Sequence, residues 1–258
     1  MASRRPERGS ASATPHDRGA DLTWSILARD ASGHFGAAIA SRFFAVGALC
    51  VHTQRGVGAL STQALMNPLY GPAGLMLLAQ GHAPAAVVAA LTATDAGQAQ
   101  RQLHVLGAQG AGAAHTGASC VDWCGHVVHD DFSVAGNMLA GPQVIEATAE
   151  AYLRSAGRPL AERLLAAMAA GEAAGGDKRG KQATALRIHG DEDHPDLDLR
   201  VDDHVEPIVE LQRLYEVSLQ RFQPFIGCLP RRHDPVGELD RSRIEAAIER
   251  FHAARPGI

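Results

Sequence analysis

Polar side chains that could bind a small substrate occur where a predicted strand ends. Ser41 and Arg42 follow the apolar run 36–40 and precede two phenylalanines. Side chains at strand ends can converge on a pocket, in which the guanidinium fork of an arginine matches a carboxylate. A hydrogen-bonded turn is the simpler interpretation of the same pair.

Uncharged amides lie beside glycine and proline in two of the least helical stretches of the chain. Gln63, Asn67 and Tyr70 lie in the first stretch, and Asn137 follows Gly136 in the second. Amide groups suit the binding of backbone or substrate carbonyls, because they offer two donors and one acceptor oxygen. Turn capping explains these residues as well as catalysis does.

A glycine-rich, charged loop at 175–182 nearly matches a phosphate-binding loop. Gln182 stands where that motif needs a serine or threonine for the metal, and a predicted helix precedes the loop while a strand follows it, which reverses the order. We therefore favour a flexible turn or a charged loop that lines a site. In the second case Asp177, Lys178 and Arg179 would bind an anionic group of the substrate.

Two clusters contain potential metal ligands without the spacing of a known site class. The acidic segment 191–204 lacks a calcium-loop or zinc-helix pattern, so a solvated acidic turn and strand face is favoured. Cys120 and Cys124 have His115 and His126 nearby, but small buried thiols are favoured over a zinc site. We expect no metal and no other cofactor.

Apolar periodicity and turn residues predict the elements that position these side chains. Strands are expected at 22–29, 34–40, 48–52, 57–60, 102–107, 113–116, 132–136, 182–189 and 196–201. Helices are expected on either side of a break at 81–84, and at 142–155, 159–173 and 207–221. Strands grouped in this way argue for helices that cover antiparallel sheets, an α+β class.

The composition is that of an ordinary globular protein, and it argues against two classes of partner. Of 258 residues, 46% are hydrophobic and 20% charged, with a formal net charge of −4 and 5% aromatic residues. No basic run is present, so neither nucleic acid nor an anionic membrane is expected as a partner. Four cysteines in a chain of this length indicate reduced thiols and a cytoplasmic location.

The chain divides into three regions. Residues 1–21 contain no apolar core of a signal peptide and are expected to be a disordered tail. Residues 22–222 form the expected domain, and residues 223–258 form a partly helical appendage. No apolar stretch reaches the roughly 18 to 20 residues that a membrane-spanning helix needs.

Six separated motifs, taken together, resemble those of a bacterial family of uncharacterised proteins with an N-terminal-nucleophile (Ntn) hydrolase-like fold. The motifs lie at 23–30, 40–47, 62–72, 136–141, 174–180 and 198–204. The resemblance implies a four-layer αββα sandwich, with two antiparallel sheets covered by helices. This expectation agrees with the order of strands and helices.

The resemblance also implies where a nucleophile would lie. Thr23 matches the first-strand residue that, once freed at its N-terminus, attacks an amide carbonyl in this superfamily. Its α-amine would act as the local base, and Ser41, Arg42 and Asn137 are candidates for orienting the amine and binding the oxyanion. Thr23 follows 22 residues here. Either the chain is cut between Leu22 and Thr23, or Thr23 remains an ordinary strand residue.

Three alternative functions are consistent with these observations. The first is a hydrolase of a small amide or related C–N bond, with Thr23 and Asn137 in catalysis and Arg42 and residues 177–179 shaping the pocket. The second is a non-catalytic protein on the same scaffold, in which the polar loops bind a small ligand that carries a carboxylate. A structural role is a third alternative, in which alanine-rich helices pack between copies of the chain in a homo-oligomer.

Overall fold

The computed structural model of the chain describes residues 23–176 and 180–255. Within these residues the strands form two sheets in which every paired neighbour is antiparallel. The larger sheet has the order β10-β9-β2-β1-β8-β7 and consists of β1 (Thr23–Arg29), β2 (Phe35–Ser41), β7 (Gly125–Val128), β8 (Phe132–Asn137), β9 (Ala183–His189) and β10 (Leu197–Val201). The smaller sheet consists of β3 (Val51–Gln54), β4 (Gly58–Ala64), β5 (Arg101–Gly107) and β6 (Ala113–Thr116), in that order.

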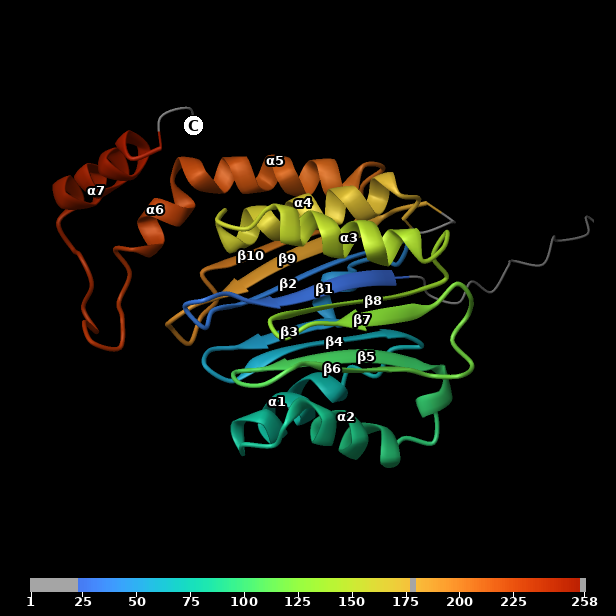
Figure 1. Cartoon of the computed structure of the whole chain (residues 1–258). Coiled ribbons are helices and arrows are strands. Elements are labelled where there is room, and N and C mark those ends of the chain that lie inside the picture. Colours follow the sequence, from blue (N-terminus) through green and yellow to red (C-terminus); the bar gives the residue numbers. More distant parts are fainter. Residues whose placement is uncertain (1–22, 177–179, 256–258) are drawn as a thin grey trace, which may run out of the picture.

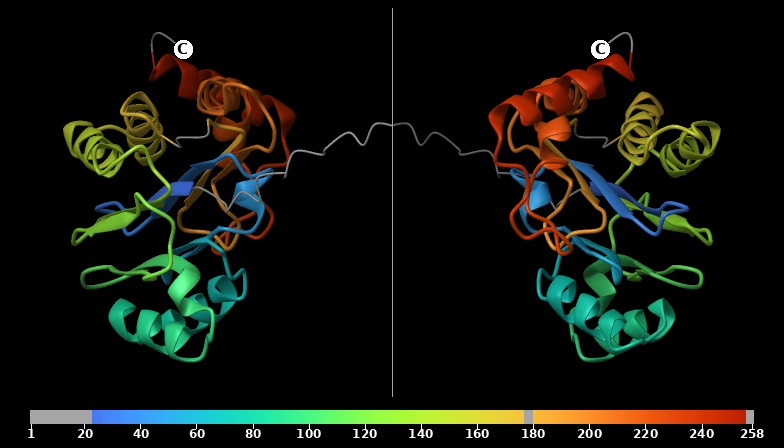
Figure 2. Two further views of the ribbon diagram at one scale, coloured as in Figure 1. Left: turned by 90° about the vertical axis from the view of Figure 1, so that its right-hand side faces the viewer. Right: turned by 90° about the vertical axis from the view of Figure 1, so that its left-hand side faces the viewer.

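Helices cover the outer faces of both sheets (Figure 1; Figure 2). The larger sheet is covered by α3 (Gln143–Arg154), α4 (Leu160–Ala173) and α5 (Pro207–Gln220). The smaller sheet is covered by α1 (Tyr70–Ala79) and α2 (Pro84–Ala93). Two short 3₁₀ helices, η1 (Val46–Ala48) and η2 (Gln98–Gln100), precede β3 and β5. The predicted four-layer αββα sandwich is confirmed.

The alternation of side chains along β1 shows how the layers are separated. Trp24 and Ile26 belong to the core between the larger sheet and its helices, whereas Leu27 belongs to the core between the two sheets. Since successive side chains of a strand point to opposite faces, Thr23 and Ser25 share the inter-sheet face with Leu27. Residues 23–28 are buried, because layers cover both faces of this central strand.

The space between the sheets is apolar at one end and polar at the other. Leu27, Phe35, Ile39 and Leu106 pack together at the apolar end. Toward the start of β1 the inward-facing side chains are instead hydroxyls, amides and one imidazole. These are Thr23, Ser25, Ser41, Ser61, Gln63, Gln102, His104, Ser133 and Asn137, all with at most 2% of their surface exposed. These polar side chains therefore form part of the buried core at this end of the sandwich.

Most predicted elements are present, with shifts of a few residues. One strand was missed: β7 has four residues of alternating partial exposure at the edge of the larger sheet, too short and too polar for a strand pattern. Residues beyond 221 carry α6 (Phe222–Ile226) and α7 (Arg241–Ala253), which extend from one end of the sandwich (Figure 1). Within the described residues no helix is both long and apolar enough to cross a membrane.

Candidate active site

Three predicted catalytic residues meet where their strands lie side by side. Thr23 is opposite Ser41 of β2 on one side and Asn137 of β8 on the other. The Thr23 hydroxyl donates a hydrogen bond of 3.2 Å to Ser41 Oγ, which also accepts one of 3.1 Å from the Phe43 amide. Asn137 Nδ2 donates to the Thr23 carbonyl oxygen at 3.4 Å. The central strand thus starts between a hydroxyl and an amide, all buried.

Asn137 is held in place by Gln102, a residue that the sequence did not single out. Gln102 Oε1 accepts hydrogen bonds from Asn137 Nδ2 at 3.0 Å and from Gln63 Nε2 at 2.8 Å. Its Nε2 lies 2.8 Å from the Gly136 carbonyl oxygen and 2.9 Å from Thr116 Oγ1. Gln102 therefore joins the smaller sheet to β8 of the larger one. The sequence offered one signal for Gln102: an amide residue at an inward-facing position of a predicted strand that is mostly apolar.

The network continues from Gln63 into a buried serine and histidine. Ser25 Oγ lies 2.6 Å from Gln63 Oε1 and 2.8 Å from His104 Nε2. His104 Nδ1 lies 2.8 Å from Ser133 Oγ. If Ser25 donates its proton to Gln63, it accepts from Nε2–H of the imidazole, and Nδ1 accepts from Ser133. All four side chains then have partners.

Burial keeps this network uncharged. Desolvation lowers the pKa of His104 from 6.5 to about 3, and His126 acts in the same direction. The imidazole is therefore neutral near pH 7, and the other inward-facing groups at this end are hydroxyls and amides. A neutral, water-poor environment disfavours a newly formed charge unless a dipole is aimed at it.

Strained backbone surrounds the polar end. Among residues 23–176 and 180–255, three residues other than glycine have positive φ: Ala45 (53°) after β2, Ala64 (64°) at the end of β4 and Met138 (50°) just after Asn137. Such conformations cost on the order of 1 to 3 kcal/mol each and tend to cluster at functional sites. Here they occur where the strands that carry Ser41, Gln63 and Asn137 end.

A cavity of about 230 Å³ adjoins Asn137. Ala64 and Met138 line it, together with Leu65, Cys120 and Val121. Among the described residues no charged side chain contributes to its wall. Burial raises the pKa of the Cys120 thiol, whose sulfur donates to the Arg101 carbonyl oxygen at 3.3 Å. The cavity therefore offers an amide, a protonated thiol and apolar surface.

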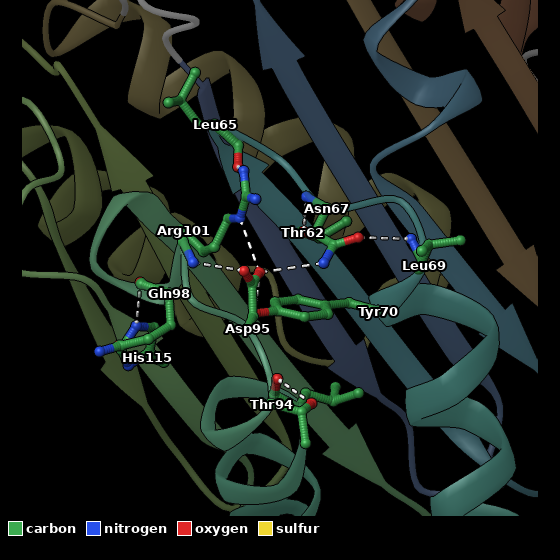
Figure 3. Close-up of polar contacts among 12 residues, drawn as sticks. Thr62, Leu65, Asn67, Leu69, Tyr70, Thr94, Asp95, Gln98, Arg101 and His115 are labelled. Atoms are coloured by element: carbon green, nitrogen blue, oxygen red, sulfur yellow. Dashed lines mark hydrogen bonds and ion pairs between the residues drawn. The ribbon is translucent and has the colours of Figure 1, made fainter.

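Asn67 and Tyr70, both predicted to bind substrate, contact Asp95 (Figure 3). Asp95 Oδ2 accepts hydrogen bonds from the Tyr70 hydroxyl at 2.8 Å, from Asn67 Nδ2 at 3.2 Å and from Arg101 Nε at 3.0 Å. Arg101, followed by the Tyr70 hydroxyl, holds the pKa of Asp95 well below its usual range. Arg101 Nη1 also donates to the carbonyl oxygen of Leu65. This cluster anchors the loop that contributes Leu65 to the cavity wall.

Of the remaining predicted site residues, one lies on the surface and three lie outside the described residues. Arg42 is exposed immediately after β2. Asp177, Lys178 and Arg179 lie outside the described residues. On either side of them, the Gly176 carbonyl oxygen accepts from the Ala140 amide at 3.2 Å, and the Gln182 amide donates to the Ser41 carbonyl oxygen at 3.0 Å. Both flanks are thus bonded close to the residues that meet Thr23.

The two clusters considered for metal binding have other contacts. Arg187 pairs with Asp198, and Arg200 pairs with Asp202. Cys124 Sγ lies 3.7 Å from the Cys120 carbonyl oxygen, and burial raises its pKa to about 11. Within residues 23–176 and 180–255 no group of three or more His, Cys, Asp or Glu side chains is arranged to hold a metal ion.

The fold and the site define an α+β sandwich with a buried, uncharged hydrogen-bond network at the end where the central strand begins. Residues 23–211 match the sequence model of DUF1028, described as a family of unknown function, and the chain belongs to that family. The first matched residue is Thr23. None of the curated proteins compared with the chain matches it.

A solved structure agrees with the family assignment. The crystal structure of protein SPO2555 from Silicibacter pomeroyi, a DUF1028 protein, is 31% identical with a TM-score of 0.79, covering 85% of this chain and 96% of that one. Anbu (ancestral beta-subunit) from Yersinia bercovieri is 13% identical with a TM-score of 0.37, covering 76% of this chain and 94% of that one. The second similarity is too low to carry an argument.

Proposed function

We propose that the protein hydrolyses a small amide or related C–N bond, with Thr23 as nucleophile after removal of the 22 preceding residues. The observation that carries this proposal is the position of Thr23. It is the first residue of the central strand, its hydroxyl is hydrogen-bonded to Ser41, and the Asn137 amide lies 3.4 Å from its carbonyl oxygen. The family match also begins at this residue.

Removal of the preceding residues would supply the missing base. A threonine hydroxyl is a poor nucleophile, whereas a free α-amine has an unperturbed pKa of about 7.7 to 8.0 and can accept its proton. The surroundings of Thr23 contain hydroxyls and amides, and burial among them lowers the pKa of an amine. Burial would therefore increase the fraction of neutral, proton-accepting amine near pH 7.

The reaction would proceed through an acyl-enzyme. Thr23 Oγ1 attacks the amide carbonyl carbon as its proton passes to the α-amine, and the resulting ammonium protonates the departing amine. Asn137 Nδ2 stabilises the oxyanion by giving up its long bond to the Thr23 carbonyl oxygen, while its bond to Gln102 keeps the amide in place. Water then hydrolyses the ester on Thr23, with the α-amine as general base.

A chain that begins at Thr23, produced by specific proteolysis of a fusion protein, tests this mechanism against the full chain. We expect amine release from a panel of small amides by the chain that begins at Thr23, and labelling of Thr23 by a β-lactone. Thr23→Ala should lower the rate by at least about 10³-fold, and Asn137→Ala by about 10² to 10³-fold. Full-length protein of intact mass that hydrolyses the amides equally well would refute the mechanism. A chain that begins at Thr23 and shows neither turnover nor labelling would also refute it.

The second candidate function is binding of a small ligand without catalysis. It is favoured by the hydrogen bonds of Asn137, whose Nδ2 is already committed to the Thr23 carbonyl oxygen and to Gln102. The uncharged cavity beside Asn137 would then bind a small neutral molecule. In that case Thr23→Ala would retain ligand-induced thermal stabilisation of the full chain, and loss of the stabilisation would argue against this alternative.

A further inference from the structure

A second cavity, of about 500 Å³, lies at the opposite end of the sandwich from Thr23. Asp30 and His34, which flank the turn after β1, belong to its lining. A seven-residue strand spans roughly 20 Å, so this cavity is remote from the site at the start of β1. It lies between the sandwich and the segment that carries α6 and α7, the helices at one end of the molecule in Figure 1.

Apolar side chains and charges of both signs line this cavity. Leu160, Ile188 and Leu197 contribute buried apolar surface from the sandwich. Arg231 and Arg255 come from the C-terminal segment, beyond the last residue matched by the family. The volume is within the range of roughly 300 to 1,000 Å³ that is common for small-molecule sites. The C-terminal segment therefore adds cationic groups to a surface that the family domain supplies with apolar and acidic ones.

Several of the carboxylates in the lining already have partners. His34 lies between two of them, with Nδ1 3.6 Å from Asp30 Oδ2 and Nε2 3.3 Å from Asp191 Oδ1. Asp30 Oδ1 also accepts the amides of Ser32 and His34, and Glu192 accepts the amide of Arg232 at 3.2 Å. These contacts satisfy Asp30, Asp191 and Glu192 within the protein.

Among the described residues, three charged groups of the lining have no ion-pair partner, besides Glu192, which accepts only the backbone amide of Arg232. Arg231 and Arg255 pair with no carboxylate there, and Asp196 pairs with no cation. The guanidinium carbon of Arg255 lies 4.6 Å from the ring centroid of Phe251, and its Nη1 is buried without a hydrogen-bond partner in the described structure. Partly buried charges without partners are costly, so a ligand that neutralises both signs would relieve this cost.

We propose that this cavity binds a small zwitterion of the α-amino-acid type with an apolar side chain. Its carboxylate pairs with Arg255 and Arg231, since a guanidinium binds a carboxylate in a bidentate manner. Its ammonium pairs with Asp196, and its side chain packs on Leu160, Ile188 and Leu197. A simple anion fits less well, because it would meet the carboxylates of the same lining without compensation.

Isothermal titration of the full chain with three matched probes tests the proposal. L-leucine carries both charges, N-acetyl-L-leucine lacks the ammonium, and L-leucinamide lacks the carboxylate. We expect saturable binding of leucine at least about tenfold tighter than that of either analogue, since each lost pair is worth about 1.4 kcal/mol or more. Absence of saturable leucine binding, or equal affinity for all three probes, would overturn the proposal.

Two variants and two controls test which side chain of the cavity pairs with each charged group of leucine. Arg255→Gln should lower the affinity for leucine and for N-acetyl-leucine at least tenfold and leave the affinity for leucinamide unchanged. Asp196→Asn should instead lower the affinity for leucine and for leucinamide. Arg250→Gln, on the exposed surface of α7, should bind leucine as the unmodified chain does, and so should Thr23→Ala at the remote site. Leucine binding that is unchanged in both test variants, or equally reduced in Arg250→Gln, would refute the assignment. Circular dichroism of each variant reports whether it is folded.

Discussion

Replacing Gln102 with methionine tests whether the amide network holds the polar end of the sandwich together. Methionine has similar length but neither donor nor acceptor of comparable strength. The change removes the acceptor of Asn137 Nδ2 and Gln63 Nε2, and the donor to the Gly136 carbonyl oxygen. Gln102, Gln63 and Asn137 are each at most 1% exposed, so water does not readily replace the lost partners.

The expected loss of stability follows from counting the buried groups that each lose a hydrogen bond to Gln102. A buried polar group that loses its hydrogen bond costs about 1 to 3 kcal/mol, so three such groups predict a loss of at least about 3 kcal/mol. Urea unfolding followed by tryptophan fluorescence measures this change. Gln98→Met, at an exposed position of η2, is the matched control and should change stability by less than about 0.5 kcal/mol.

A loss below about 1 kcal/mol for Gln102→Met would refute the reasoning. It would mean that Gln63, Asn137 and the backbone at Gly136 find new partners after a small rearrangement. The same variant bears on the proposed chemistry. In the chain that begins at Thr23 it should lower kcat more than it changes KM, because Gln102 orients Asn137 without contacting substrate.

Three further predictions concern titratable groups. Because burial holds the pKa of His104 at about 3 in the folded protein, against 6.5 when unfolded, the protein should lose stability as the pH falls from about 6.5 toward 3. In His104→Gln the melting temperature should depend less steeply on pH in that range, and an equal slope would contradict the assignment. Arg101 and Tyr70 lower the pKa of Asp95, so its contribution is complete above about pH 4 and is lost below it. Asp95→Asn should cost about 1 to 2 kcal/mol at pH 7, with a smaller difference from the unmodified chain at pH 2.5, measured by urea unfolding. Burial raises the pKa of the Cys120 and Cys124 thiols, so iodoacetamide should modify both more slowly at pH 8 than it modifies free cysteine, as measured by mass spectrometry. Modification at the rate of free cysteine would show that these thiols are more ionised than expected.

The sequence by itself determined the local elements and much of their order. The β1–β2 hairpin follows from two short runs separated by Asp30 and Gly33, and the structure places Gly33 at φ 82° with Asp30 bonded to the turn. Pro142 and Pro159 begin two of the predicted helical ranges, and the structure places each of them directly before α3 or α4. These features depend on residues a few positions apart, so they can be predicted from the sequence.

Only the tertiary structure showed which other polar residues surround the predicted catalytic group. Thr23, Ser41 and Asn137 are brought together by strand register, and the family resemblance had already grouped them. Gln102 and His104 could not be found in this way, because a lone polar residue in a strand becomes informative only when its partner in the other sheet is known. Asn67 and Tyr70 illustrate the converse: Asp95, 25 or more residues away in the chain, accepts their hydrogen bonds.

There is a physical reason why the sequence predicts the elements but not the polar contacts between them. Periodicity reports which face of an element is buried, whereas a hydrogen bond between sheets depends on the packing of layers whose strands are far apart in sequence. The apolar end of the interior could be predicted, since burial of hydrocarbon is non-directional. The polar end required each donor to meet an acceptor at about 3 Å, and only the assembled sandwich sets those distances.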